Sequence, residues 1–202
     1  MIVIIDYGMG NPRSVQNMLK RLGYPSLISG NADEIQNASK IILPGVGAFD
    51  AAMERIEEME IKDTLNFKAL EDKIPVLGIC LGMQLMTSES EEGSLEGLGW
   101  IPSVTKKFNL SEGFKIPHMG WNLVIPEKKH SIIDEMEENH RCYFVHSYYV
   151  ELDNDEDLLL SCSYGKKFCA AFHSENIFGF QFHPEKSHRF GKKLLENFAK
   201  IC

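Results

Sequence analysis

The chain has 202 residues, of which 44% are hydrophobic and 25% charged, a composition typical of one globular domain. With 21 basic against 29 acidic residues the formal net charge is -8, and no basic cluster exceeds Lys192-Lys193 with its neighbours, so we expect no nucleic-acid partner. No apolar run approaches the roughly 18 residues of a membrane span, and residues 1–5 lead directly into Asp6 without a basic start or cleavage site. We therefore expect a single cytoplasmic domain over residues 1–202, with no membrane partner.

The first half of the chain alternates apolar strands with amphipathic helices. Residues 2–5 are a predicted buried strand, and Asn11 followed by Pro12 is typical of a helix start, after which apolar residues recur at the helical period. Further strands are predicted at 26–29, 40–43 and 74–79, and helices at 49–59 and 61–70. Strands separated by helices indicate a parallel sheet with both faces covered.

After residue 97 the pattern changes to strands that are too closely spaced for helical crossovers. Strand-like segments lie at 100–108, 120–125, 141–150, 158–163, 167–173 and 177–182, with a turn at 174–176. A final amphipathic helix over 190–201 is expected to cover the sheet. The predicted fold class is therefore α/β, with an open, mostly parallel sheet flanked by helices and extended by antiparallel strands.

The cysteines and histidines do not form a pattern typical of disulfides or of metal sites. The five cysteines are an odd number without a CxxC pair, and the seven histidines show neither HxxxH nor HxH spacing, so we expect no metal and no cofactor. His146 and His173 lie in strand-like segments beside aromatic residues and are interpreted as structural histidines. Four cysteines are interpreted as buried and inert: Cys142, Cys162, Cys169 and Cys202.

The fifth cysteine lies in a segment that predicts a nucleophile, Ile74-Pro-Val-Leu-Gly-Ile-Cys80-Leu-Gly-Met-Gln84. A buried strand ends just before Cys80, and Gly78 and Gly82 flank it. This glycine, nucleophile, glycine pattern is typical of a strand-to-helix nucleophile elbow, here with sulfur in place of oxygen. The thiol would lie near the positive end of the following helix, which favours the reactive thiolate.

A thiol nucleophile needs a base and a group that orients the base, and Gly179-Phe-Gln-Phe-His183-Pro-Glu185 offers both. Pro184 favours extended backbone at His183, and residues two apart on an extended segment point to the same side. We therefore expect the carboxylate of Glu185 to hold the imidazole. The tripeptide alone is common, and it is its combination with Cys80 that predicts a triad.

A third segment, Leu43-Pro-Gly-Val-Gly-Ala-Phe49, follows another predicted parallel strand and would lie at the same edge of the sheet. Its glycines permit close approach of the backbone. We expect the N–H of Val46 or Gly47, together with that of Leu81, to form an oxyanion hole for a tetrahedral intermediate. An ordinary strand-to-helix turn is the alternative interpretation.

Together these motifs resemble the class I, or triad, glutamine amidotransferases, through Gly-Ile-Cys80-Leu-Gly-Met-Gln84 and Gln-Phe-His183-Pro-Glu185. Four further segments resemble one branch of this family, the HisH-type glutaminase subunits of imidazole glycerol phosphate synthase: residues 6–11, 43–47, 117–122 and 143–148. The resemblance spans residues 6–198 and implies the family's flavodoxin-like fold.

The resemblance also implies a reaction and a partner. Cys80 would attack the side-chain amide of L-glutamine, forming a glutamyl thioester and releasing ammonia, with His183 as the base and Glu185 as the orienting acid. A HisF-type (βα)8-barrel synthase would receive the neutral ammonia through a shielded channel and use it in histidine biosynthesis. The implied glutamine-binding residues are Gly47, Gln84 and Ser147, and the implied interface residues are Asn11, Trp121, Asn122 and Lys186.

Two segments depart from the resemblance, Pro12 and His188-Arg189-Phe190. They leave the triad untouched but admit a paralogue that supplies ammonia to an enzyme of surface-glycan sugar amination or amidination. Two further alternatives are a catalytically silent regulatory subunit and a free-standing thiol hydrolase. Glutamate release with and without a synthase partner distinguishes these alternatives.

Overall fold

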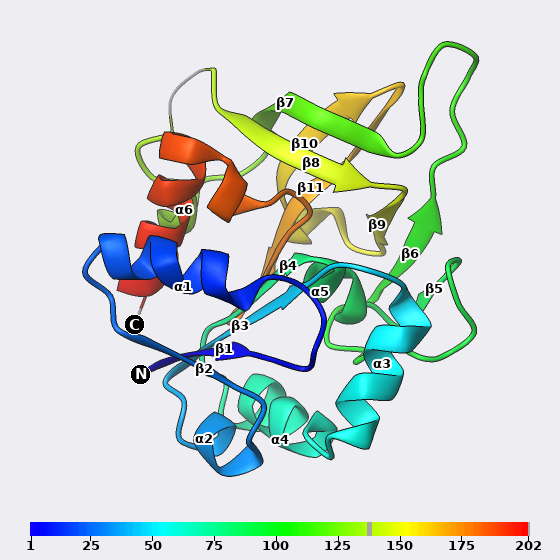
Figure 1. Ribbon diagram of the computed structural model, residues 1–202. Coiled ribbons are helices and arrows are strands. Elements are labelled where there is room, and N and C mark those ends of the chain that lie inside the picture. The colour runs from blue at the N-terminus through cyan, green and yellow to red at the C-terminus, as the bar shows by residue number, and fades with distance from the viewer. Residues whose placement is uncertain (137–138, 202) are drawn as a thin grey trace.

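A large mixed sheet runs through the centre of the protein, for which the computed structural model describes residues 1–136 and 139–201 (Figure 1). Its strands are β1 Ile2–Ile5, β2 Ser26–Ser29, β3 Lys40–Gly45, β4 Val76–Cys80, β7 His118–Pro126, β8 Arg141–His146, β10 Leu158–Tyr164, β11 Lys166–Ser174 and β12 Ile177–Phe180. Over the described residues their order is β2-β1-β3-β4-β12-β11-β10-β7-β8. The sheet confirms the α/β class with added antiparallel strands.

The strands from β2 to β12 pair in parallel and form what we call the parallel half. All residues of β1, β4 and β12 are buried, as expected for strands with helices over both faces. Figure 1 shows α1 Pro12–Arg21 and α6 His188–Lys200 on one face. The other face packs against α2 Ala32–Gln36, α3 Phe49–Glu58, α4 Lys62–Asn66 and α5 Leu81–Leu85.

Helix α1 begins where the sequence predicts. The side chain of Asn11 accepts a hydrogen bond from the backbone N–H of Ser14 at 3.2 Å, and Pro12 occupies the first helical position, where no N–H is needed. Val15 and Leu19 are buried on the face that the helix turns toward the sheet. The cap therefore fixes the start of the helix, and burial of its apolar stripe holds it against the sheet.

The remaining strands, β11, β10, β7 and β8, pair antiparallel and form what we call the antiparallel flank. Strand β11 joins β12 through the predicted turn, where Ser174 pairs with Ile177. A smaller sheet of β5 Glu89–Ser90, β6 Ser103–Lys107 and β9 Tyr148–Leu152 lies beside the flank. The two parts of the large sheet meet between β12 and β11.

Two predicted elements are wrong in detail. The single strand predicted at 141–150 is two strands in different sheets, because the chain leaves the large sheet after His146 and enters the small one at Tyr148. The helix predicted at 61–70 is α4 followed by a π-helical turn at Phe67–Glu71. The sequence analysis also missed the short elements α2 and β5, which contain too few residues to show a periodic pattern.

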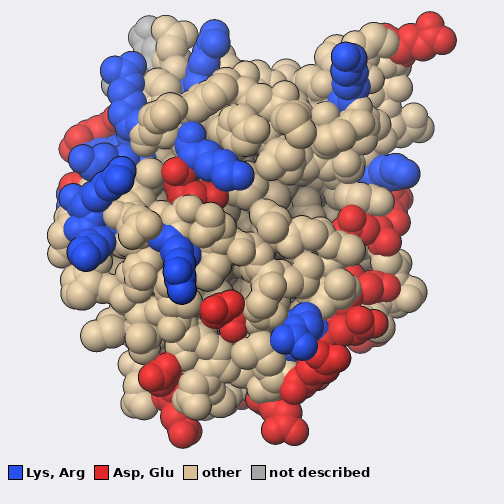
Figure 2. All heavy atoms as spheres, viewed as in Figure 1, with Lys and Arg blue, Asp and Glu red and all other residues tan. Residues whose placement is uncertain are grey.

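Charge is unevenly distributed over the surface. In the view of Figure 2 the basic side chains gather at the left and upper left, over α1 and α6, and the acidic side chains lie mainly at the lower right, over α3. Among the described residues no helix is both long and apolar enough to cross a membrane. The thiols of Cys80, Cys142, Cys162 and Cys169 are free and buried, and Cys202 lies outside the described residues.

Candidate active site

Cys80 lies at the point where β4 turns into α5. Its backbone has φ 54° and ψ -109°, a conformation that costs free energy for a residue with a side chain. The turn is possible because its neighbours have no side chains: a Cβ on Gly78 would lie 2.6 Å from the carbonyl oxygen of Gly82, and a Cβ on Gly82 would overlap the carbonyl oxygen of Leu43. The close contact of these backbones holds the thiol at the edge of the sheet.

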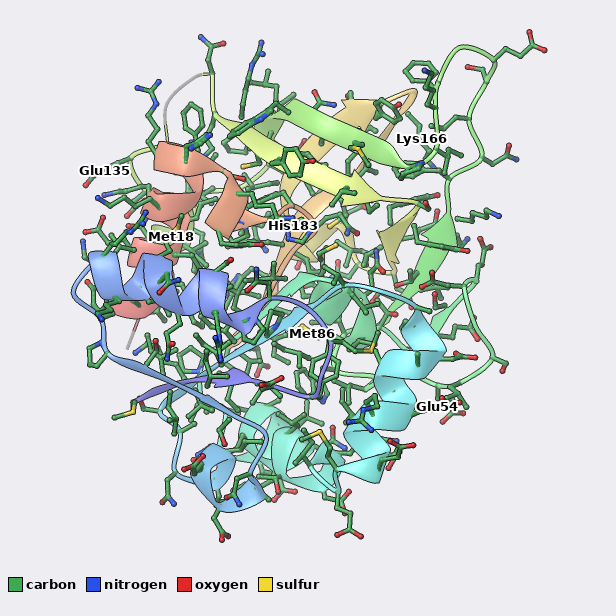
Figure 3. All side chains as sticks on the ribbon, viewed as in Figure 1. Met18, Glu54, Met86, Glu135, Lys166 and His183 are labelled. Atoms are coloured by element: carbon green, nitrogen blue, oxygen red, sulfur yellow. The ribbon has the colours of Figure 1, made fainter. Side chains whose placement is uncertain are left out.

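His183 follows β12, the parallel neighbour of β4, and Figure 3 shows it near the centre of the face in view. Its Nδ1 lies 2.9 Å from Oε1 of Glu185, and the two side chains are only 3% and 5% exposed. Among the described residues, Nε2 of His183 has no hydrogen-bond partner. The second nitrogen is therefore available for proton transfer.

The carboxylate reaches the imidazole by a route that the sequence analysis did not predict. Residues 183 and 185 do not share one side of an extended segment, because Pro184–Lys186 forms a 3-10 turn. The backbone at His183 is extended, as Pro184 requires, and the turn begins immediately after it. Ser187 closes the turn, since its hydroxyl donates to the carbonyl of His183 at 2.6 Å and its N–H donates to the carbonyl of Pro184.

The electrostatics of the site favour a charged imidazole. Burial by itself lowers the pKa of His183, but Cys80 and the Glu185 carboxylate more than offset that effect and raise the pKa to about 9. Near neutral pH the ring therefore carries a proton beside the sulfur of Cys80. A protonated imidazole beside the sulfur can act as a proton donor at the nucleophile.

Two buried glutamines connect the thiol to the wall of the site. Nε2 of Gln181 donates to Sγ of Cys80 at 3.8 Å, and Oε1 of Gln181 accepts from Nε2 of Gln84 at 3.0 Å. Gln84 also donates to the carbonyl of Tyr148 at 3.1 Å. Sequence reasoning missed Gln181, although a polar residue between Phe180 and Phe182 at a buried strand end is a signal that could have found it.

A cavity of about 320 Å³ opens beside Cys80. Its wall contains all the residues that the sequence analysis assigned to the oxyanion hole or to substrate binding: Val46, Gly47, Leu81, Gln84 and Ser147. The wall is completed by Glu92, Pro117, Val145, His146 and Tyr148. His183 and Glu185 are not among the lining residues, and both side chains are buried.

Glu92 is a second residue that the sequence analysis missed, because it lies in an acidic run that resembles an ordinary solvated segment. Its Oε2 accepts a hydrogen bond from the backbone N–H of Phe49 at 2.9 Å, and burial raises its pKa. A partly buried carboxylate at a cavity wall is a natural partner for a cationic group.

The glycine loop at residues 45–47 lies beside the nucleophile, at the end of the neighbouring strand β3. Gly45 pairs with Cys80 in the β3–β4 register, Val46 is 45% exposed, and Gly47 has φ 118°. A Cβ on Gly45 would overlap the hydroxyl of Tyr7, which is fully buried. The loop is thus anchored at Gly45 and open at Val46.

The residues implied to contact a partner lie around one edge. Trp121 is 42% exposed and stacks on the ring of His188, with centroids 5.1 Å apart. Nζ of Lys186 lies 5.8 Å from the ring centroid of Tyr143. Helix α1, which Asn11 caps, contacts the Pro184–Lys186 turn. Asn122 differs from the others because it is half-buried and donates to the carbonyl of Ser163.

Comparison with known proteins identifies the family. Residues 3–202 match the family model described as Glutamine amidotransferase class-I. The chain belongs to the class I glutamine amidotransferases. Among sequence relatives, this amidotransferase is 52% identical over 200 residues to imidazole glycerol phosphate synthase subunit HisH 2 of Methanococcus maripaludis, covering 99% of each chain. It is 49% identical over 201 residues to HisH 2 of Pseudomonas aeruginosa, covering 100% of each.

Solved structures agree with the fold of this class I amidotransferase. A putative GMP synthase component from Thermoplasma acidophilum superposes with a TM-score of 0.73 at 20% identity, covering 98% of this chain and 91% of the other. PurLQS from Thermotoga maritima also gives 0.73, at 21% identity, covering 98% and 96%. The predicted class I amidotransferase fold is confirmed.

Proposed function

We propose that the chain is the glutaminase subunit of imidazole glycerol phosphate synthase, and that it hydrolyses L-glutamine to glutamate and ammonia. The observation that carries the proposal is that Cys80 lies at the cavity wall and interacts with His183, which Glu185 holds, at the ends of neighbouring parallel strands. The HisH relatives support the pathway. The chain acts as one domain over residues 1–202, in the cytoplasm, without a metal or cofactor.

Cys80 supplies the nucleophile. Its thiolate attacks the amide carbon of the glutamine side chain, and the His183 imidazolium gives its proton to the departing nitrogen, so that ammonia leaves and a glutamyl thioester forms. His183, now neutral, takes a proton from water as the water attacks the thioester. Glutamate leaves, and the thiolate and imidazolium are restored. Glu185 holds the ring in position and stabilises its charged form.

The backbone of the turn and the glycine loop stabilise the intermediate. Negative charge develops on the amide oxygen, and the N–H of Leu81 together with that of Val46 or Gly47 accommodates it. All three residues line the cavity beside Cys80.

The remaining walls hold the substrate. A volume of about 320 Å³ suits one small metabolite. Gly47, Gln84 and Ser147 contact glutamine, and the carboxylate of Glu92 binds its ammonium group. Both hydrogens of the Gln84 amide are donated to protein acceptors, which leaves its Oε1 for the substrate.

The partner is a HisF-type (βα)8-barrel synthase, consistent with relatives that are named as subunits. Asn11, Trp121, Asn122 and Lys186 contribute to the interface. Ammonia passes to the barrel as a neutral molecule, because protonation in bulk water would remove its nucleophilic lone pair.

One observation favours a second candidate. His188, which lies in a segment that departs from the HisH resemblance, stacks directly on Trp121 at the proposed interface. A paralogue that supplies ammonia to a surface-glycan sugar amination or amidination enzyme would retain the triad and differ at this edge. Assay with each class of synthase separates the two candidates.

Glutamate release by the assembled complex tests the proposal. We expect Cys80→Ala to reduce the rate at least about 10⁴-fold, because no other group replaces the nucleophile. Cys162→Ala, at a buried thiol that is not part of the cavity lining, is the matched control and retains activity. Retained hydrolysis in Cys80→Ala would contradict the proposal, and full activity of the isolated wild-type chain would favour a free-standing hydrolase.

A further inference from the structure

Two buried histidines that the proposed mechanism does not use face each other behind the cavity wall. His118 on β7 pairs directly with His146 on β8, and both residues are buried, at 3% and 6% exposure. Nδ1 of His118 lies 3.0 Å from Nε2 of His146. Since His146 also lines the cavity, the pair connects the antiparallel flank to the site.

The surroundings determine which nitrogens carry hydrogen. Nδ1 of His146 lies 2.6 Å from the carbonyl oxygen of Tyr148, so it must donate. Burial lowers the pKa of His118 to about 4 and that of His146 to about 3, so both rings are neutral near pH 7. In a neutral ring the second nitrogen accepts, and Nδ1 of His118 therefore donates to Nε2 of His146.

The chain of hydrogen bonds continues to Asn122. Nδ2 of Asn122 donates to the carbonyl of Ser163 at 3.0 Å, and its Oδ1 accepts from the N–H of Leu123, which fixes the orientation of the amide. The same Nδ2 lies 3.4 Å from Nε2 of His118, the nitrogen that carries no hydrogen in this tautomer. Along the chain from Asn122 through His118 to His146, each donor therefore points toward the cavity.

The other end of the chain reaches the proposed substrate wall. The carbonyl of Tyr148 accepts from both His146 and Gln84, and Ser147 lies between the two residues of the His146–Tyr148 contact. Aromatic rings enclose the histidines: His118 stacks between Phe144 and Tyr164, with centroid separations of 4.9 and 4.1 Å. Water has little access to replace a lost hydrogen bond there.

We propose that His118 and His146 are positioning residues for glutamine binding. Their hydrogen bonds, which run in one direction from Asn122 to the Tyr148 carbonyl, hold the 147–148 wall and the Gln84 amide in the geometry that accepts the substrate. The inference rests on the proposed function of the same cavity. Neither histidine exchanges a proton with glutamine, so their loss affects binding more than chemistry.

Steady-state kinetics of the assembled complex test this role. His118→Phe keeps an aromatic ring but removes both nitrogens, and we expect the KM for glutamine to rise about tenfold with kcat within about threefold of wild type. His118→Asn places an amide N–H near the position of Nδ1, and we expect it to return KM to within about threefold of wild type. His173→Phe is the control, because His173 also stacks on an aromatic ring and binds a carbonyl, but that carbonyl belongs to Glu175 at the β11–β12 turn, which is not part of the cavity wall.

A wild-type KM in His118→Phe would overturn the inference, and so would an equal rise in His118→Phe and His118→Asn, which would show that an N–H near the position of Nδ1 does not restore binding. Nitrogen NMR of the wild-type complex tests the same claim without a substitution. We expect both histidines as neutral Nδ1–H tautomers at pH 7, and a charged ring or an Nε2–H tautomer at either position would overturn it. Loss of activity in Cys80→Ala alongside a wild-type KM in His118→Phe would leave the proposed function standing and remove only the positioning role.

Discussion

The parallel half and the antiparallel flank contribute to the cavity by different physical means. At the ends of β3 and β4 the backbones of Leu43, Gly78 and Gly82 approach so closely that no side chain fits between them. In β7 and β8 the side chains are joined instead by a hydrogen bond between His118 and His146, within a cluster of aromatic rings. The nucleophile is thus held by steric fit, whereas the opposite wall is held by polar groups whose protonation states must be correct.

Glu185→Gln changes the carboxylate in the turn that follows β12, the last strand of the parallel half, and we expect the largest effect there. The amide cannot stabilise an imidazolium and can favour the wrong ring tautomer, so glutamine hydrolysis by the complex should fall about a hundredfold to a thousandfold. Glu175→Gln, at the exposed β11–β12 turn, is the control and should leave the rate unchanged. A rate within threefold of wild type for Glu185→Gln would show that the carboxylate has no orienting role.

Gly82→Ala tests steric fit in the parallel half. The added methyl would overlap the carbonyl oxygen of Leu43, so we expect the free energy of unfolding to fall by about 3 kcal/mol or more in urea denaturation. Gly23→Ala is the control, since that glycine has φ 85° but open space around it, and the cost should be about 1 kcal/mol. Equal losses would mean that backbone conformation, and not close packing, determines the tolerance of this region.

The pKa values of His183 and His118 should differ in the same titration. The pKa of His183 is raised from 6.5 to about 9, so its charged form stabilises the fold fully below pH 6.5, and this contribution is lost as the pH rises through 9. His118, whose pKa is lowered to about 4, should remain neutral throughout. NMR titration checks both, and Cys80→Ala should lower the pKa of His183 because it removes one of the groups that stabilise the imidazolium.

Lys73→Met, far from the cavity, should have the smallest effect. Nζ of Lys73 lies 2.6 Å from Glu175, but both side chains are more than half exposed. Exposed ion pairs contribute little, so we expect a change in unfolding free energy below about 0.5 kcal/mol. A larger change in thermal denaturation would show that surface electrostatics matter for this fold.

The same contrast explains how far the sequence predicts the molecule. Gly78, Cys80 and Gly82 lie within one short segment of the chain, so their local pattern predicted the turn that the structure contains. His183 and Glu185 were also predicted together, but the 3-10 turn between them was not. The preference of Pro184 for extended backbone applies to the residue before it, His183, and does not extend to the turn that begins at Pro184 itself.

Other site residues depend on distant contacts. Glu92 is held at the cavity wall by a hydrogen bond from the N–H of Phe49, 43 positions away. His118 and His146 lie opposite each other only because of the register between β7 and β8. No local pattern contains this information. The break between β8 and β9 was missed because residues 141–150 are rich in strand-forming aromatic residues and valine, and only the polar pair His146-Ser147 marks the change of sheet.

The tight turn around Cys80 has a consequence for how the protein can adapt. Glycines 78 and 82 leave no spare volume, so substrate should meet a preorganised thiol, and any adjustment on binding must occur elsewhere. The wall residue with room to change is Val46, whose residue exposure at the cavity is 45%. Laboratory evolution toward other amide donors should therefore accumulate useful changes at that position and leave residues 78–82 untouched.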